Sequence, residues 1–362
     1  MYQLQDYNYD LPSELIAQKP TLPRDHCRLL SYNLKDQTIS HDKFYNLLDY
    51  LPKDAVLVFN NSSVIPARLK GKKSKTKGKV EILLLKPIKD NIWEVMIKTK
   101  RKRKGMMIKF PKSSLQAKLI KRLDKMRYVV EFNYKGQSLN NILQRQGLVP
   151  LPPYIKVDQS NKEVKRWLKR QYETIYADKD KKGSVAAPTA GLHFTNRLLK
   201  KIDKADLERL NVTLHVGLGT FAPVRVEDIS QHKMHTELGL INKKTLQKLV
   251  KYKKAGRPII SVGTTSVRVL EGLVAKYLRY TDKQWAKVPQ VVSENIGIFI
   301  YPGYKFKVLD GLITNFHLPK STLLMLVSAF ITKDELDRIY QEAINEKYKF
   351  YSFGDSMVIY DK

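Results

Sequence analysis

Three histidines in this chain stand where an imidazole is well placed to move a proton. His193 follows the small residues AAPTAGL, and His215 and His317 come at the ends of the strand-like runs NVTL and GLITNF. Histidine titrates near pH 6.5, so it is largely neutral at cellular pH and can take up and return a proton. His193, His215 and His317 are therefore competing general bases, and a capping or positioning role for His193 before the NRLLKK helix is the alternative.

The segment GTTSVRVLE (263–271) places hydroxyl residues where a buried strand gives way to a helix. Backbone N–H groups at such a turn, together with Thr264, Thr265 and Ser266, suit a carboxylate, phosphate or ribose oxygen. Ordinary N-capping explains the same residues equally well. Arg268 is a candidate ligand for an anion, or else a partner of Glu271 in an ion pair along one helix face.

Two more segments place polar or flexible residues at strand ends. TNFHLPKSTLL has Asn315 close to His317, with Pro319 at the expected first position of a helix. Ligands of open α/β sheets bind at the carboxyl ends of strands, which favours Asn315 as a binding residue. TLHVGLGTF has Gly217 and Gly219, which permit close approach of a ligand to the backbone, although a simple glycine turn fits as well.

Metal and hydrolase chemistry have little support in the sequence. His232 and His235 are three residues apart, but no Cys or carboxylate pattern completes a metal site, and neither GxSxG nor a P-loop is found. Cys27 is the only cysteine, which excludes a disulfide within the chain. The longest apolar run, 323–331, is too short to cross a membrane, and no signal peptide is evident, so we expect a cytoplasmic protein without a metal.

The charge of the chain favours a polyanionic partner. Lys+Arg number 66 against 35 Asp+Glu, a formal net charge of +31, and residues 67–135 alone hold 23 Lys+Arg and 5 Asp+Glu. Such an excess binds nucleic acid or an anionic surface by counterion release, although a lysine-rich proteome would also produce it. KRKRK (100–104) is the densest basic run and is expected to contact an RNA backbone through Arg101, Lys102, Arg103 and Lys104.

The elements that must position these residues fall into two patterns. Short runs rich in β-branched and aromatic residues recur every 10 to 12 positions in the basic segment: GKVEILLLK, NIWEVMIKTK, MMIKF, LQAKLIKRL and RYVVEFNY. They predict a small antiparallel barrel at 67–150. Elsewhere strands at 55–61, 211–216, 257–263, 297–303 and 306–316 alternate with helices at 264–278 and 320–330. We therefore predict a larger, discontinuous α/β domain (1–66 and 151–362) with an inserted β-barrel domain.

In order along residues 11–357, the blocks of this chain resemble one family, the S-adenosylmethionine:tRNA ribosyltransferase-isomerases of queuosine biosynthesis. The blocks are LPSELIAQKP, CRLL, VIPARLKG, GKVEILLL, PLPPYI, AAPTAGLHFT, TLHVGLGTF, ISVGTTSVRVLE, IFIYPGYKF, NFHLPKSTLLMLVSAF and YSFGDSM. The resemblance implies an α/β domain with an inserted barrel. It also implies transfer and isomerisation of the ribosyl group of S-adenosylmethionine onto 7-aminomethyl-7-deazaguanine at the wobble position of tRNA, with release of adenine and methionine.

The implied reaction assigns roles to particular residues. A proton on the ribose carbon next to the sulfonium is acidified by the positive charge, and a base can remove it. A carboxylate or aromatic face stabilises the sulfonium, for which Asp355, Phe221 and Tyr301 are candidates. Arg68, at the domain junction, fits a tRNA phosphate or the methionine carboxylate. The remaining expected substrate-binding residues are Thr189, Gly191, Gly217, Gly219, Thr264, Thr265, Ser266, Arg268 and Asn315.

Two other functions remain open from the sequence. A tRNA methyltransferase would also use S-adenosylmethionine and a basic surface, but it would show a glycine-rich loop after its first strand, which is not found. A non-catalytic RNA-binding protein would bind tRNA without consuming S-adenosylmethionine. On the main interpretation S-adenosylmethionine is a consumed co-substrate, no cofactor is needed, and the family resemblance favours a monomer.

Overall fold

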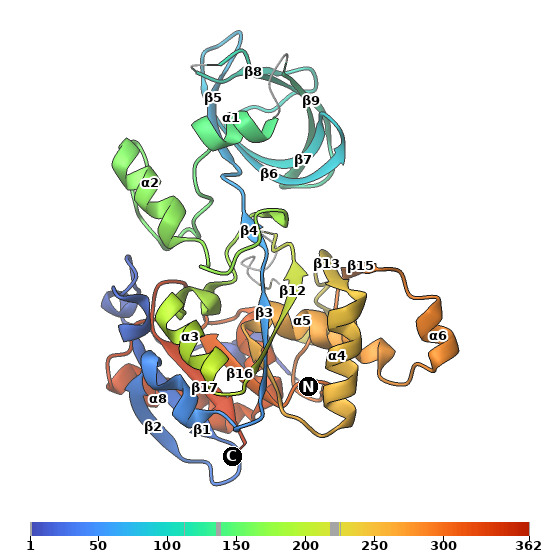
Figure 1. The fold of residues 1–362 in the computed structure, drawn as a ribbon. Helices are drawn as coiled ribbons and strands as arrows, with labels where there is room; N and C mark the ends of the chain where they lie inside the picture. The colour runs from blue at the N-terminus through green and yellow to red at the C-terminus, as the bar shows by residue number, and fades with distance from the viewer. Residues whose placement is uncertain (1, 112, 135–138, 218–223, 225, 362) are drawn as a thin grey trace.

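The computed structural model describes residues 2–361 except 112, 135–138, 218–223 and 225. Figure 1 shows two bodies, a β-barrel above and a larger α/β domain below, with both chain ends in the lower one. No helix of these residues is both long and apolar enough to cross a membrane. The predicted fold class, an α/β domain with an inserted antiparallel β-barrel, is confirmed.

The lower domain is built on a mixed sheet of nine strands within the described residues. In spatial order the strands are β15 (Val291–Ile296), β13 (Glu237–Asn242), β12 (Glu208–Leu214), β3 (Val56–Asn60), β14 (Ile259–Val262), β16 (Gly311–Asn315), β17 (Ser356–Tyr360), β1 (Arg28–Asn33) and β2 (Ile39–Lys43). The neighbours β12, β3, β14 and β16 run parallel, whereas β17 is antiparallel to β16.

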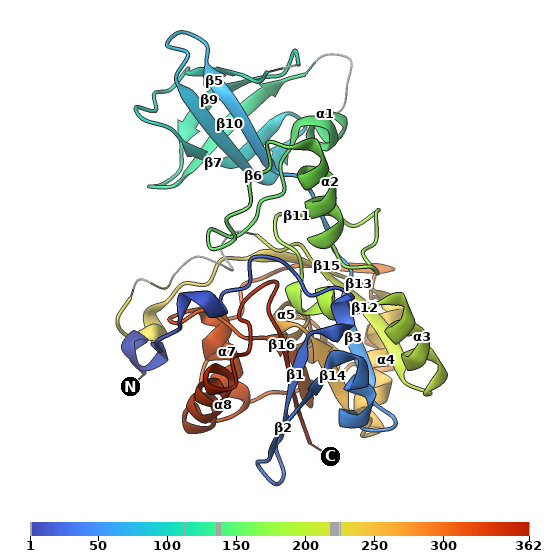
Figure 2. The same cartoon turned by 90° about the vertical axis from the view of Figure 1, so that its left-hand side faces the viewer.

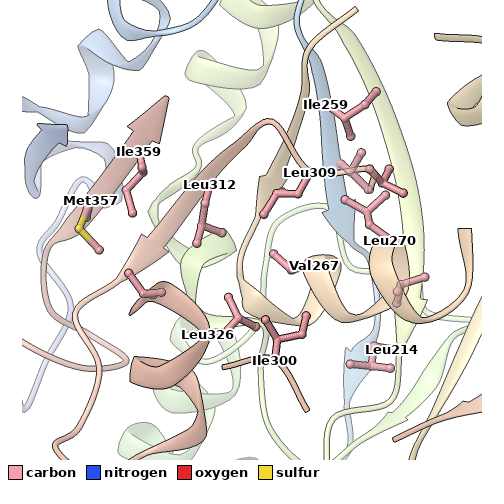
Figure 3. Packing of buried hydrophobic residues seen from close by; sticks show 14 of the residues in the cluster. Leu214, Ile259, Val267, Leu270, Ile300, Leu309, Leu312, Leu326, Met357 and Ile359 are labelled. Carbon is pink, nitrogen blue, oxygen red and sulfur yellow. The ribbon is translucent and has the colours of Figure 1, made fainter. Parts of the chain in front are cut away.

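Strand β3 is buried along its whole length, and all of its residues except Asn60 are apolar, because both faces of the sheet are covered. Val56 and Val58 face a core formed with α4 (Lys243–Lys254), α5 (Thr264–Gly272), α7 (Thr322–Phe330) and α8 (Lys333–Asn345). Leu57 and Phe59 face the opposite core, formed with α3 (Asn196–Lys204) and the 3-10 helix η4 (Phe44–Tyr50). In Figure 3, Val267 and Leu270 of α5 pack among the side chains of the first core.

The helix after His193 begins as the sequence predicts, but the one after His317 begins later. Thr195 caps α3 by accepting a hydrogen bond from Leu198 N at 3.2 Å, so His193 is not the cap. Ser321 caps α7 in the same way, and the helix begins at Thr322. The prediction that Pro319 is the first helical residue is therefore wrong, because the serine three residues before Leu324 supplies the hydroxyl cap.

Residues 297–303 and 306–310 were predicted as strands and are not. Strand β15 ends at Ile296, and the chain from there to β16 is irregular. The buried carboxylate of Glu271 accepts hydrogen bonds from the backbone N–H groups of Lys307, Val308 and Leu309 at 2.9 to 3.0 Å. Those N–H groups are thus used by a side chain and cannot join a β-ladder.

The barrel closes in the order β10-β7-β6-β5-β8-β9. Its strands are β5 (Arg68–Lys73), β6 (Lys79–Lys89), β7 (Ile92–Lys98), β8 (Met107–Lys109), β9 (Gln116–Arg122) and β10 (Arg127–Asn133). All five predicted runs are present, and β5 is an additional strand. Helix α1 (Leu139–Gln146) contributes Leu139, Ile142 and Leu143 to the barrel core.

Short elements link the two bodies. Strand β4 (Ser63–Val64) leads up into the barrel and pairs in parallel with β11 (Lys182–Ser184). Helix α2 (Lys162–Gln171) lies beside this passage in Figure 2, and the short α6 (Asp282–Ala286) projects from the lower domain in Figure 1. The chain thus crosses between the bodies at one end of β3, near the edge where the candidate residues gather.

Candidate active site at the carboxyl edge of the sheet

Parallel pairing brings the predicted segments to one edge of the sheet. Strands β12, β3, β14 and β16 all end there, so His215, Gly263 and Asn315 lie along the same rim. Strand β17 runs the other way and begins at this rim, which adds Asp355. The loop 183–193 joins the rim because Val185 N donates to Val216 O at 2.8 Å. The edge is where α/β sheets bind ligands.

His193 ends the 3-10 helix η5 (Thr189–His193) and is only 4% exposed. Thr189 Oγ1 donates to Asn315 Oδ1 at 2.9 Å, so the Asn315 amide nitrogen faces His193 Nε2, also at 2.9 Å, and donates to it. The proton of the neutral ring is then on Nδ1, which donates to Cys27 Sγ at 3.1 Å. Burial, aided by the Arg24 charge, lowers the pKa of His193 to about 3.

His317 is held in a comparable buried setting. Its Nε2 lies 2.8 Å from Thr314 Oγ1, its backbone N–H donates to Tyr340 Oη at 2.9 Å, and Tyr9 Oη donates to its carbonyl. Burial lowers the pKa of His317 to about 3. A ring with so low a pKa is a weak base at cellular pH. The hydrogen bonds of His317 therefore favour a role in fixing the end of strand β16.

His215 differs from the other two histidines. It directly follows β12 and is only partly buried, and its Nδ1 has no hydrogen-bond partner among the described residues. The ring lies over Gly183, where a Cβ would come within 2.7 Å of Nδ1. Burial, followed by the charge of Lys181, lowers the pKa of His215 below its usual 6.5. Nδ1 is therefore buried against Gly183, and the ring can take a proton from a ligand only through Nε2, which makes no hydrogen bond to the described residues.

The space beside Gly191, the glycine of AAPTAGL, is filled by another side chain of the protein. A Cβ at Gly191 would lie 1.8 Å from the hydroxyl oxygen of Tyr176. Gly191 therefore makes room for Tyr176, and the prediction that it makes room for a nucleoside has no support from this packing. Thr189 is partly exposed and is held by Asn315.

The turn into α5 is formed from small residues. Gly263 has φ +85°, in the left-handed region that favours glycine, and a Cβ there would lie 3.4 Å from the Cβ of Ala190. The AAPTAGLH loop and the GTTS turn are therefore neighbours. Ser266 Oγ donates to Val262 O at 2.9 Å, whereas the buried Thr265 Oγ1 has no partner among the described residues.

Arg268 belongs to a buried ion pair between elements. It pairs with Glu237 of β13, and its Nη2 also donates to Ile296 O at 3.0 Å. The other Glu237 oxygen accepts from Gly217 N at 2.6 Å, so the pair fixes the start of the glycine segment. The alternative of an Arg268–Glu271 ion pair along one helix face is wrong, because the Glu271 carboxylate is used by the 307–309 backbone.

The residues predicted to stabilise the sulfonium differ in their surroundings. Both oxygens of the buried Asp355 accept backbone N–H groups, from Arg28 and Lys349 at 2.7 Å each, so this carboxylate fixes two chain turns. Burial outweighs these bonds and raises the pKa of Asp355. Tyr301 stacks on Phe299 with centroids 5.0 Å apart. Gly219 and Phe221 lie outside the described residues.

Arg68 lies at the junction of the two bodies. Its Nη2 donates to Leu151 O at 3.0 Å, and its Nε is 3.6 Å from Glu81 Oε1. It lines a cavity of about 520 Å³ together with the 151–158 segment and Lys98. These contacts hold the Arg68 guanidinium at the junction between the barrel and the lower domain.

The basic run forms an exposed turn at the rim of the barrel. Arg101, Arg103 and Lys104 are exposed, whereas the Lys102 ammonium lies 5.7 Å from the centre of the Tyr128 ring. Lys73 Nζ donates to the carbonyls of Lys100 and Arg101, at 2.5 and 3.0 Å, which shapes the turn. This surface presents several cations to solvent.

His232 and His235 are the two histidines whose spacing was considered for metal binding in the sequence. Within the described residues no group of three or more His, Cys, Asp or Glu side chains could hold a metal ion. His232 instead packs edge-on against Phe299, with centroids 5.2 Å apart. Two residues of the rim were missed from the sequence, Cys27 and Glu237. The single cysteine just before an apolar strand was a usable signal for the first, but no sequence pattern marks the second.

The comparisons with known proteins agree along almost the whole chain. A family model described as "Queuosine biosynthesis protein" matches residues 4–359. The S-adenosylmethionine:tRNA ribosyltransferase-isomerase of Sulfurihydrogenibium sp. (strain YO3AOP1) is 47% identical over 359 residues, covering 99% of each chain. That of Fusobacterium nucleatum is 46% identical over 359 residues, covering 99% of this chain and 97% of the relative. A crystal structure of S-adenosylmethionine tRNA ribosyltransferase from Thermotoga maritima matches with a TM-score of 0.51 and 32% identity, covering 98% of this chain and 99% of that one.

Proposed function

This chain belongs to the queuosine biosynthesis protein family, and we propose that it is an S-adenosylmethionine:tRNA ribosyltransferase-isomerase whose reaction takes place at the carboxyl edge of its sheet. It transfers and isomerises the ribosyl group of S-adenosylmethionine onto 7-aminomethyl-7-deazaguanine at the wobble position of tRNA. The products are epoxyqueuosine-tRNA, adenine and methionine. The observation that supports this location is the convergence of His215, the GTTS turn and the His193–Asn315 pair on one rim.

Among the three histidines we assign the base to His215. A general base needs a free lone pair within reach of the proton it removes. The Nε2 lone pair of His193 accepts from Asn315, whereas Nε2 of His215 makes no hydrogen bond to the described residues. The other His215 nitrogen, Nδ1, is buried against Gly183, so Nε2 is the atom that acts as the base. His215 takes the proton from the ribose carbon next to the sulfonium and can return it to the departing adenine. His193 then acts as a positioning residue that holds Asn315.

The remaining parts of the proposal concern partners and setting. S-adenosylmethionine is a consumed co-substrate and no further cofactor takes part. The protein acts in the cytoplasm as a monomer. The basic barrel turn and Arg68 contact the tRNA, because both place cations on the side of the molecule that the barrel occupies.

Product analysis tests the reaction. Purified protein incubated with S-adenosylmethionine and tRNA bearing the deazaguanine is expected to release adenine and methionine in equal amounts, measured by liquid chromatography. S-adenosylhomocysteine as the product would instead identify a tRNA methyltransferase. Tight, salt-sensitive tRNA binding with no consumption of S-adenosylmethionine would identify a non-catalytic RNA-binding protein.

Neutralising Arg101, Lys102 and Arg103 together is expected to weaken tRNA binding and to flatten its salt dependence. On duplex nucleic acid, the slope of log K against log salt decreases in magnitude by roughly 0.9 for each phosphate that the protein no longer neutralises. Turnover at saturating tRNA survives, because the turn lies on the barrel and not at the rim of the sheet. Filter binding at several salt concentrations measures the slope.

The matched control for this variant removes three exposed lysines of helix α4 in the lower domain, Lys244, Lys251 and Lys254. It carries the same loss of net charge and is expected to change the slope less. An equal effect in the two variants would show that net charge alone, and no binding at the barrel turn, controls tRNA affinity.

A further inference from the structure

Helix α5 begins with backbone groups that no side chain satisfies. Gly263 occupies its N-cap position without a side-chain hydrogen bond, whereas Thr195, Asn242 and Ser321 cap α3, α4 and α7 through their side chains. The Gly263 N–H donates to Ile313 O at 2.8 Å, and the first N–H of the helix itself with a backbone acceptor is that of Ser266, which donates to Gly263 O at 3.1 Å. The N–H groups of the first two helical residues have no acceptor within a helix, so they are free for a ligand.

A buried hydroxyl lies at this same helix start. Thr265 is 7% exposed, and its Oγ1 has no hydrogen-bond partner among the described residues. The atom lies 3.7 Å from the position of a Cβ on Gly263, which places it over the first turn of the helix. Burying a hydroxyl without a hydrogen bond costs free energy, and a ligand that hydrogen-bonds to it removes that cost. Ser266 cannot be that donor, since its hydroxyl already bonds Val262 O.

The surroundings favour an anion of small size. The N-terminal end of a helix carries partial positive charge. The one guanidinium on α5, that of Arg268, is already committed to Glu237, so the helix start itself must supply the attraction. Ala190 closes one side of the turn, 3.4 Å from the position of a Cβ on Gly263, so a side chain at position 263 would narrow the approach to the helix start.

We propose that the start of α5 binds the carboxylate of the methionine part of S-adenosylmethionine, through Thr265 Oγ1 and the backbone N–H groups of Thr264 and Thr265. This inference rests on the proposed function, since a carboxylate is the only anionic group of that substrate. It locates the methionine end of the substrate at β14. The adenosine end then extends along the rim toward the neighbouring strand ends, where His215 follows β12.

The test compares two ligands on the full chain without tRNA. Calorimetry measures the dissociation constants of S-adenosylmethionine and of its decarboxylated analogue, in which hydrogen replaces the carboxylate. The wild-type protein is expected to bind the analogue about ten- to a hundredfold more weakly, the range for hydrogen bonds to a charged group. Thr265→Val is expected to weaken S-adenosylmethionine binding about tenfold and to leave binding of the analogue unchanged. Thr265→Ser keeps the discrimination.

The same variant reports on its own folding. Valine matches threonine in shape, and Thr265 Oγ1 has no partner to lose, so Thr265→Val is expected to raise the melting temperature while it weakens substrate binding. Thr322→Val is the matched control, because Thr322 Oγ1 is also buried and unpartnered among the described residues, at the start of α7. It is expected to leave the ratio of the two dissociation constants at the wild-type value.

Two outcomes would overturn the inference. Equal affinity of the wild-type protein for both ligands, in a preparation that releases adenine and methionine, would refute the carboxylate site and leave the proposed function intact. The ratio at issue is the dissociation constant of the analogue divided by that of S-adenosylmethionine. If this ratio fell equally in Thr322→Val and Thr265→Val, the assignment of the site to α5 would be wrong. A protein that never consumes S-adenosylmethionine would instead refute the proposed function, a separate result from either of these.

Discussion

His215→Ala is expected to lower kcat by about two to four orders of magnitude, the usual contribution of a positioned general base. The reason is that Nε2 of His215 makes no hydrogen bond to the described residues, whereas both ring nitrogens of His193 are hydrogen-bonded to buried partners. Affinity for tRNA is expected to stay within about threefold, a difference below roughly 0.7 kcal/mol. Single-turnover assays with saturating tRNA measure the step.

The control is His193→Gln. The glutamine side chain can occupy the space of the imidazole ring and keep one hydrogen bond to Asn315. We expect it to cost activity by about tenfold through misplacement of the rim. If His193→Gln and His193→Ala both abolished turnover while His215→Ala did not, the base would be His193. If none of the three histidines mattered, histidine base catalysis would be refuted, and Asp355 or the amine of the substrate would be the next candidates.

The pH profile separates the histidines independently. A base works only when unprotonated, so kcat/KM falls as the pH drops through its pKa. Burial lowers the pKa of His215 below 6.5, so the acidic limb lies at lower pH than for an ordinary histidine. For His193 or His317 the limb would lie near pH 3, because burial lowers their pKa to about 3. A profile that is flat down to the pH of unfolding would contradict the assignment to His215.

Arg268→Leu is expected to lower the free energy of unfolding by about 3 to 5 kcal/mol. The two side chains of the Arg268–Glu237 pair are 3% and 4% exposed, so removing the arginine leaves a buried carboxylate without its counter-charge. The glycine segment would loosen as well, since Glu237 holds Gly217 N. Urea denaturation followed by circular dichroism measures the change.

The exposed pair Arg209–Asp203 provides the control. Its side chains are 32% and 48% exposed, and Arg209→Leu is expected to cost less than about 1 kcal/mol because solvent screens the pair. Replacing Arg268 and Glu237 together by leucine and glutamine should recover much of the stability, since no buried charge then remains. A cost for Arg268→Leu no larger than that for Arg209→Leu would refute the structural role given to the buried pair.

The sequence predicted the rim of the sheet better than the contacts within it. Apolar runs that end at a polar residue or a glycine, such as those before His215, Gly263 and Asn315, predict parallel strands with a shared carboxyl edge, and the pairing follows that pattern. The barrel runs were predictable because alternation has a period of two. Strand β5 was missed, since RLKGKK has little apolar content along its length.

Contacts between distant segments could not be predicted in the same way. Cys27 meets His193 across 166 residues of sequence, and Glu237 meets Arg268 across 31, and neither spacing has a local signature. The 306–310 run looked like a strand because Phe306, Val308 and Leu309 continue into the apolar run of β16, yet the carboxylate of Glu271 binds its N–H groups. Tyr176 fills the room beside Gly191, a packing detail that composition alone does not indicate.

The most direct test of the proposed function follows two labels through one reaction. S-adenosylmethionine carrying ¹⁴C in its ribose and ³H in its methyl group is incubated with the protein and with tRNA bearing 7-aminomethyl-7-deazaguanine. Ribosyl transfer is expected to place ¹⁴C in the tRNA and to release ³H as free methionine. Recovery of ³H in the tRNA, with ¹⁴C in S-adenosylhomocysteine, would contradict it.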